Sequence, residues 1–193
     1  MKNAIFNLKE YIRKAYESTS QKLAPNIVRG HLRSISTDIE DGIGLFLSEV
    51  LPEDYQILLD PSIHVDGKNN RPDALVTDSN MNVVAMIEIK ANMGWCRDAS
   101  WVLGDIVEND SKFKEMKTLN CEFSSQESIE VKYGEGVKLF LISLTDSNCP
   151  AEKHEANKRV AAEKGVHQFN LFSGWYGSLE PLEIQLFIDE LLR

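Results

Sequence analysis

The chain has 193 residues, of which 42% are hydrophobic and 26% are charged, and its formal net charge is −9. This length predicts one domain with a core large enough to form without disulfides. The acidic balance argues against indiscriminate coating of nucleic acid. The sequence has no apolar run of about eighteen residues and no secretory apolar core at its N-terminus, which predicts a cytoplasmic protein without a membrane span.

The first thirty-five residues predict a helix followed by a basic segment. Ile5, Leu8 and Ile12 have helical spacing, which predicts a helix over residues 3–22 that ends before Pro25. Basic residues outnumber acids here, so this part of the chain is a candidate for contact with a nucleic-acid backbone, although a solvated helix face explains the same charges. The basic residues are Lys2, Lys9, Arg13, Lys14, Lys22, Arg29 and Arg33.

A second helix is predicted between residue 36 and Pro52. Thr37, followed three residues later by Glu40, is typical of a capping box at its start. Gly42 and Gly44 each lower helix propensity by about 1 kcal/mol relative to alanine, so we expect close packing against a sheet there. The predicted buried stripe consists of Ile39, Ile43, Phe46, Leu47 and Val50.

The rest of the chain predicts alternating strands and helices. The strands are expected at 55–63, in two runs of the segment 71–95, at 137–144 and at 166–172, and the helices at 99–118, 151–164 and 181–192. Asp98 is the expected N-cap of the first of these helices. Segments 64–70 and 120–136 are polar and are predicted as loops, the second as a loop or lid.

The segment 71–95 is the centre of the functional argument. It contains two apolar strands joined by a turn at Asp78 to Asn82. A two-residue loop at Asn80-Met81 would pair Thr77 with Val84, Leu75 with Met86 and Asp73 with Glu88. Opposed side chains lie on one face of a sheet, and Lys90 shares that face because the period of a strand is two.

Two carboxylates that face each other on an apolar sheet repel, and burial of either as an isolated charge costs several kcal/mol. Lys90 neutralises one of the two charges of Asp73 and Glu88. A divalent cation would neutralise both, since Mg²⁺ favours one or two carboxylates together with waters and phosphate. The alternative interpretation is a surface hairpin with ordinary salt bridges.

Pro72-Asp73, fourteen intervening residues and then Glu88-Ile89-Lys90 resemble the PD-(D/E)XK motif of restriction-type nucleases. The resemblance implies that Asp73, Glu88 and the Ile89 carbonyl hold Mg²⁺, with Mn²⁺ able to substitute, and that Lys90 lies beside the attacking water. Many nucleases of this class add an acid from the helix before the first strand. Glu40 matches by position, with Asp41 and Glu49 as weaker candidates, and its other interpretation is the capping role.

The predicted order of elements also resembles this class. We therefore expect an α/β (α+β) fold with a mixed sheet and a restriction-endonuclease-like core of helix, three strands, helix and strand. Residues 36–145 would form the catalytic core, with a helical, partly basic segment at 1–35 and additions at 146–193, all within one nuclease domain spanning 1–193.

The resulting hypothesis is a Mg²⁺-dependent endonuclease of double-stranded DNA, most specifically a bacterial type II restriction endonuclease that acts as a homodimer. A repair, junction-resolving or antiphage-effector nuclease of the same fold is the first alternative, and a non-catalytic nucleic-acid-binding or protein-binding module is the second. The sequence contains neither the phosphate-binding motifs GxxxxGK[ST] and GxGxxG nor the hydrolase motifs GxSxG and HExxH. Cys96, Cys121 and Cys149 lack CxxC spacing and indicate neither a disulfide framework nor a zinc site.

Overall fold

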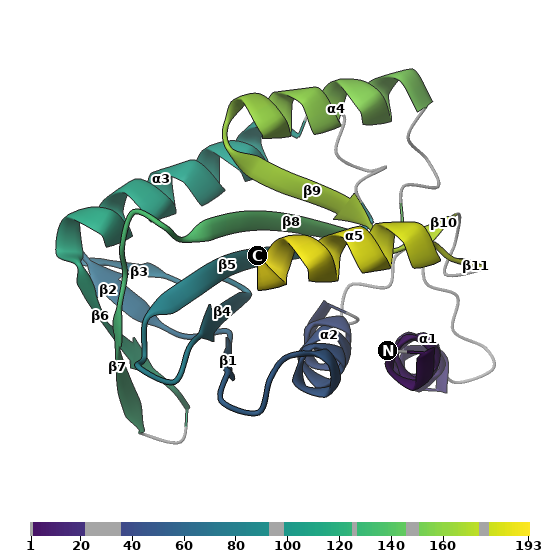
Figure 1. Ribbon diagram of the computed structural model, residues 1–193, viewed down its shortest axis with the longest axis horizontal. Coiled ribbons are helices and arrows are strands. Elements are labelled where there is room, and N and C mark those ends of the chain that lie inside the picture. The colour runs from purple at the N-terminus through teal and green to yellow at the C-terminus, as the bar shows by residue number, and fades with distance from the viewer. Residues whose placement is uncertain (1, 22–35, 93–98, 125–126, 146–150, 174–177) are drawn as a thin grey trace.

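A computed structural model of the chain contains a five-stranded mixed sheet with the strand order β1-β4-β5-β8-β9 (Figure 1). It describes residues 2–21, 36–92, 99–124, 127–145, 151–173 and 178–193. The strand β4 is antiparallel to both of its neighbours, β1 and β5, while β5, β8 and β9 run parallel. This arrangement confirms the predicted α/β fold with a mixed sheet.

The main helices and strands occur in the predicted order and near the predicted positions. The sheet is made of β1 (Gln56–Leu59), β4 (Ala74–Thr77), β5 (Val83–Asn92), β8 (Lys138–Thr145) and β9 (Val166–Asn170). The helices are α1 (Lys2–Gln21), α2 (Ser36–Val50), α3 (Ser100–Met116), α4 (Ala151–Glu163) and α5 (Pro181–Leu192).

Helices cover both faces of the sheet. The helices α1, α2 and α5 pack on one face, where the side chains of Ala85, Ile87 and Ile89 from β5 are buried. The helices α3 and α4 lie on the opposite side (Figure 1), and Met86 of β5 contributes to the core there. Because alternate residues of β5 face opposite ways, Glu88 and Lys90 lie on the same face as Met86, which is the face toward α3.

The register between β4 and β5 confirms the main part of the predicted hairpin. Leu75 lies opposite Met86, as expected, and Ala74 lies opposite Ile87. Near the turn the prediction is wrong, because the register shifts after Val76 and Thr77 lies opposite Val83 rather than Val84. The cause is a larger turn, in which the Asp78 N–H donates to the Asn82 carbonyl at 3.0 Å. The irregularity lies at the turn, so the register at the other end of the hairpin is unaffected.

Both segments predicted as loops contain hairpins instead. Residues 64–70 contribute to β2 (Ile63–Val65) and β3 (Lys68–Asn70), and residues 120–136 contribute to β6 (Thr118–Glu122) and β7 (Ser128–Lys132). The polar residues of β6 are exposed, while Leu119 and Cys121 alternate with them and are buried against the α3 side of the core. Such a half-buried strand is more polar in sequence than a central strand, which explains the wrong prediction.

Two predicted strands are divided. The strand predicted at 55–63 ends as β1 at Leu59, and Ile63 begins β2. Between them Asp60 adopts a positive φ of 46° before Pro61. The strand predicted at 166–172 ends as β9 at Asn170, after which β10 (Phe172–Ser173) pairs with β11 (Ser178–Leu179). The first of these breaks is important for the site, because it stops β1 beside the start of β4.

The N-terminal part of α2 differs from the prediction in its capping. The helix begins at Ser36, so Thr37 is already inside it and the capping box predicted with Glu40 is wrong. At the start of α3, Ala99 occupies the N-cap position without a side-chain hydrogen bond, and Asp98 lies outside the described residues.

The two glycines of α2 allow close packing on two different partners. A Cβ at Gly44 would lie 2.6 Å from Cδ1 of Leu59 in β1, so the predicted approach to the sheet is confirmed there. A Cβ at Gly42 would instead lie 3.3 Å from Cβ of Tyr11 in α1.

None of the helices in the described part of the chain has the length and apolar character needed to cross a membrane.

Candidate active site

Three acids occupy neighbouring positions across three adjacent strands. Leu59 pairs with Ala74 and Ala74 pairs with Ile87, so Asp60, Asp73 and Glu88 follow at the same end of β1, β4 and β5. The Asp60 N–H donates to the Asp73 carbonyl at 2.9 Å, which fixes the first two of these positions relative to each other. We refer to Asp60, Asp73 and Glu88 as the acidic row.

Lys90 joins two members of the acidic row. Its Nζ donates a short hydrogen bond to Oε1 of Glu88 and lies 3.7 Å from Oδ2 of Asp73. The side chains are largely buried, with exposed fractions of 26% for Lys90, 19% for Asp73 and 25% for Glu88. Because both carboxylates contact one ammonium, they point to the same side of the sheet, and the predicted convergence of Asp73, Glu88 and Lys90 is confirmed.

The electrostatics of the two carboxylates follow from this burial. Desolvation raises the pKa of Asp73, and the opposing effects of Lys90 and of the Ile89 N–H only partly offset it. Desolvation and the nearby charge of Asp73 raise the pKa of Glu88, against the lowering effect of Lys90. Asp105 of α3 adds to the negative potential at Glu88. The site therefore carries more negative charge than its single lysine neutralises.

The pKa of Lys90 is raised above its ordinary value. Desolvation alone would lower this pKa, but the charges of Glu88 and Asp73 and the hydrogen bond to Glu88 together outweigh the desolvation. A lysine beside a bound cation would instead have its pKa pulled down. With only carboxylates as neighbours, the pKa shifts in the opposite direction and Lys90 remains protonated.

Glu40 lies in the first turns of α2 and is half-buried. Burial and the charges of Asp73 and Asp60 raise the pKa of Glu40 to about 7, while Lys90 lowers it. These mutual effects place the Glu40 carboxylate in the electrostatic field of the acidic row, although α2 packs on the opposite face of the sheet. Glu40, the fourth predicted acid, is thus close enough to interact electrostatically with Asp73, Asp60 and Lys90.

Ile89 contributes through its backbone. Its N–H donates to Oδ2 of Asp73 at 2.6 Å, and this bond orients the Asp73 carboxylate. In a strand the N–H and C=O of one residue point to the same edge, so the Ile89 carbonyl is also directed toward the Asp73 side. The Ile89 side chain is buried in the core on the other face.

The donor set fits a hard divalent cation. Within the described ranges, no group of three or more His, Cys, Asp or Glu side chains is close enough to hold a metal ion. Asp73 and Glu88 nevertheless supply two carboxylates on one side of the sheet, and this number satisfies Mg²⁺, which keeps several of its waters. The excess negative charge at these carboxylates favours the same kind of ligand.

Asp60 and Arg71 also lie at the site, although no motif in the sequence marks them. The guanidinium of Arg71 donates from Nη2 to Oδ2 of Asp60 at 2.6 Å. The available sequence signals were weak, namely an acid before Pro61 at a strand end and a basic residue two positions before Asp73. The antiparallel pairing of β1 with β4 is what places both residues at the site.

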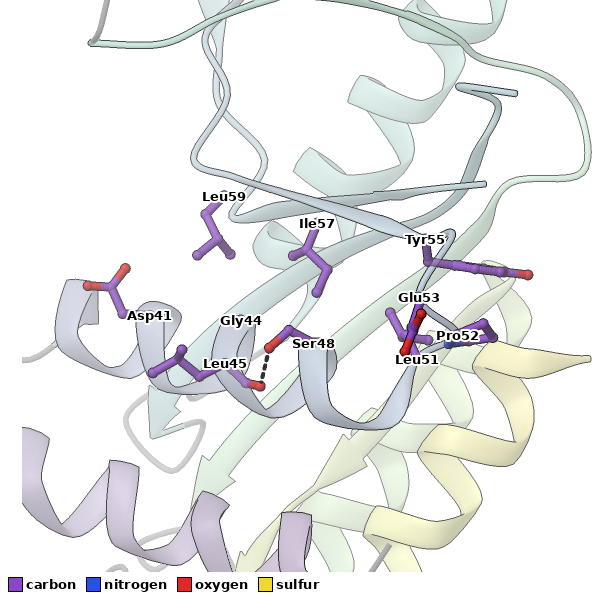
Figure 2. Close-up of a pocket in the computed structure, with 10 residues that line it drawn as sticks. All are labelled: Asp41, Gly44, Leu45, Ser48, Leu51, Pro52, Glu53, Tyr55, Ile57 and Leu59. Carbon is purple, nitrogen blue, oxygen red and sulfur yellow. Dashed lines mark hydrogen bonds between the residues drawn. The ribbon is translucent and has the colours of Figure 1, made fainter. Parts of the chain in front are cut away.

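The two weaker acid candidates on α2 have other surroundings. Glu49 accepts hydrogen bonds from Nδ2 of Asn7 at 3.0 Å and from the Tyr11 hydroxyl at 2.5 Å, so it belongs to the contact between α1 and α2. Asp41 lines a cavity of about 710 Å³ between α2 and β1. Figure 2 shows Leu45, Ile57 and Leu59 around the same cavity. Asp73, Glu88 and Lys90 do not line it.

The basic N-terminal segment is only partly described. Arg13 pairs with Glu10 at 2.6 Å and with Glu17 at 2.5 Å, so its charge is neutralised within α1. Lys22, Arg29 and Arg33 lie outside the described residues.

Cys121 is buried and has a free thiol. Burial raises the pKa of this thiol to about 11, which is consistent with a small core residue. Cys96 and Cys149 lie outside the described residues.

Comparison with known proteins identifies a structural likeness. No protein-family model matches the sequence, and no curated protein matches it. The solved structure of NucC from P. aeruginosa ATCC27853, in its cAAA-bound form, is similar over 96% of this chain and 89% of that chain, with a TM-score of 0.56. The two sequences are 12% identical, so the likeness concerns the fold, which is restriction-endonuclease-like.

Proposed function

We propose that the protein is a metal-dependent nuclease that hydrolyses phosphodiester bonds of double-stranded DNA. The observation that carries the proposal is the contact of one lysine with two largely buried carboxylates at the end of two adjacent strands. A cluster of this composition costs stability unless a bound cation offsets its excess negative charge. The restriction-endonuclease-like fold supports the same interpretation.

Asp73 and Glu88 would hold the metal ion, with the Ile89 carbonyl as a further oxygen ligand and Glu40 as a water-bridged or second-metal ligand. Mg²⁺, or Mn²⁺ in its place, would acidify a bound water and neutralise charge on the phosphate. The chain itself orients these ligands. The Ile89 N–H holds the Asp73 carboxylate, and the strand register holds Glu88 opposite it.

Lys90 would orient the attacking water and stabilise the negative charge that develops on the phosphoryl oxygens. Its raised pKa keeps the ammonium protonated while only carboxylates surround it, which suits charge stabilisation. A bound cation would lower this pKa, so the same lysine would then be able to accept a proton from the water. Asp73 and Glu88 hold the Lys90 ammonium beside the proposed metal ligands, where it could stabilise charge or accept a proton.

Cleavage of a supercoiled plasmid with Mg²⁺, and with a chelator in its place, tests the proposal. Asp73→Ala and Lys90→Ala should each reduce the rate at least about a hundredfold, as is typical when one group that stabilises transition-state charge is removed. Lys112→Ala is a matched control, because Lys112 is also a quarter exposed and paired with an acid, but on α3. If Asp73→Ala and Lys90→Ala cut as fast as the unchanged protein, the assignment is wrong.

The kind of nuclease is a further part of the proposal. A type II restriction endonuclease, acting as a homodimer so that two sites cut two strands, should convert unmodified phage DNA into discrete fragments. The cAAA-bound form of NucC favours a second candidate, an effector nuclease that depends on a bound nucleotide. That candidate predicts a smear of products and a rate that rises when cAAA is added.

A further inference from the structure

The charge of the site creates a problem for an anionic substrate. The acidic row and Glu40 together carry four carboxyl groups, and Lys90 already contacts two of them. Every phosphodiester carries one negative charge, and a field of one sign repels a ligand of the same sign. A cation at the rim of the site would therefore be needed to attract the nucleic-acid backbone.

Arg71 has the position and the exposure for this task. Its Nη2 donates to Oδ2 of Asp60 at 2.6 Å, and the exposed fractions of the two side chains are 54% and 51%. Among the residues that the structure describes, Asp60 is the only side chain to which Arg71 bonds. Of the five N–H donors of the guanidinium, one is bonded to Asp60, and the half-exposed side chain leaves the others accessible to a ligand.

Asp60 holds this guanidinium at a fixed place relative to Asp73. The Asp60 N–H donates to the Asp73 carbonyl at 2.9 Å, and the pairing of Leu59 with Ala74 sets the register just before it. Arg71 also lies two residues before Asp73 in the chain, so the ion pair stands directly beside the acidic row.

From this geometry we propose that Arg71 binds a backbone phosphate of the DNA next to the acidic row and that Asp60 positions it. The proposal rests on the proposed nuclease function. Guanidinium binds phosphate oxygens through two parallel N–H donors, whereas an ammonium acts as a point charge. An exposed ion pair contributes little stability. A phosphate can therefore bind the guanidinium together with Asp60, or take the place of Asp60 as its partner.

The experiment measures how salt affects binding of a fluorescent duplex DNA. Ca²⁺ replaces Mg²⁺, because its longer bonds and looser coordination retain carboxylate binding while disfavouring the geometry for cleavage. Arg71→Ala should weaken binding about tenfold or more and make the slope of log K against log salt shallower by about 0.9, the change expected for one lost phosphate contact. Arg71→Lys should keep the slope, because the charge remains, and should bind more weakly than the unchanged protein.

Arg193→Ala is the matched control. Arg193 is also an exposed arginine that pairs with an acid, Glu190, at 2.9 Å, and Glu190 accepts a hydrogen bond from Lys138 at the opposite end of the parallel strands. Its slope should equal that of the unchanged protein. An unchanged slope and affinity for Arg71→Ala, in a protein that binds and cuts DNA, would overturn the inference alone. Failure of the unchanged protein to bind or cut DNA would overturn the proposed function, and the inference with it.

Discussion

Replacement of Lys90 by methionine tests, without any assay of activity, whether the ammonium stabilises the fold by offsetting the charges of Asp73 and Glu88. Methionine has a similar length and no charge, so the change removes the ammonium between Asp73 and Glu88 and leaves most of the packing. The ammonium is 3.7 Å from Oδ2 of Asp73 and hydrogen-bonded to Glu88. A pair at about 4 Å with an effective dielectric constant of about 20 interacts by about 4 kcal/mol.

The net loss of stability should be smaller than this Coulomb term. Removal of one partner from a fully buried ion pair costs about 3–5 kcal/mol. The three side chains here are 19–26% exposed, so water relieves part of that cost. We expect Lys90→Met to lower the free energy of unfolding by about 2 kcal/mol at neutral or higher pH without metal, after this discount.

The pH dependence has a definite sign. The pKa values of both carboxyls are raised, so acid protonates them before it protonates ordinary carboxyls, and the missing ammonium then matters less. The loss should shrink as the pH falls from about 8 toward about 5. Because the pKa of Lys90 is also raised, the lysine stays charged across this whole range and does not confuse the comparison.

Urea unfolding, followed by circular dichroism without metal and then with MgCl₂, measures these effects. Mg²⁺ should restore part of the stability lost in Lys90→Met, because an ion that binds only the folded state stabilises it. Lys112→Met is the control, since Lys112 lies 2.6 Å from a single, largely exposed partner and its loss should change stability by less than about 1 kcal/mol. Equal urea midpoints for Lys90→Met and the unchanged protein at high pH would refute the reasoning.

The remaining predictions concern Glu40 and Gln168. Burial and nearby acids raise the pKa of Glu40 from 4.5 to about 7, so its ionisation opposes folding as the pH rises between these values. Glu40→Gln should therefore stabilise the metal-free protein progressively from about pH 4 to about pH 8, as measured by urea unfolding, and an equal effect at both ends would contradict this. Gln168 in β9 is 8% exposed, and within the described part of the chain neither its Oε1 nor its Nε2 has a hydrogen-bond partner. Gln168→Leu should raise the free energy of unfolding by about 1–3 kcal/mol in the same assay, and a loss of stability would instead indicate a buried water bound to the amide.

The hairpin between β4 and β5 shows how far local pattern can determine a site. Alternation of apolar residues and a cluster of turn residues were sufficient to align Leu75 with Met86, and this alignment put Asp73, Glu88 and Lys90 on one face. The turn itself was predicted one residue too short, because its hydrogen bonds depend on how the Asp78 carboxylate accepts from the backbone and side chain of Asn82. Far from the turn, the alternation of side chains between the two faces still gave the correct register.

The helices were also predicted from a repeated apolar spacing. Details at their ends were predicted wrongly where they depend on individual hydrogen bonds. Apolar spacing located α2, but its cap was misplaced, since capping depends on single hydrogen bonds rather than on a repeated pattern. The hairpins β2–β3 and β6–β7 were predicted as loops because β2, β6 and β7 bury only one face and β3 buries none, so exposed residues dominate their composition.

Hydrophobic periods in the sequence were enough to predict most helices and strands, and the hairpin pattern identified three ionisable groups that lie within eighteen residues of one another in the chain. The positions of Asp60 and Arg71 beside Asp73, and the effect of the same charges on Glu40, follow instead from contacts between distant parts of the chain. These residues come from a separate strand, a connecting segment and a helix on the other face. Their proximity follows from the pairing of β1 with β4 and the packing of α2, and a long-range contact of that kind leaves no periodic signal in the chain.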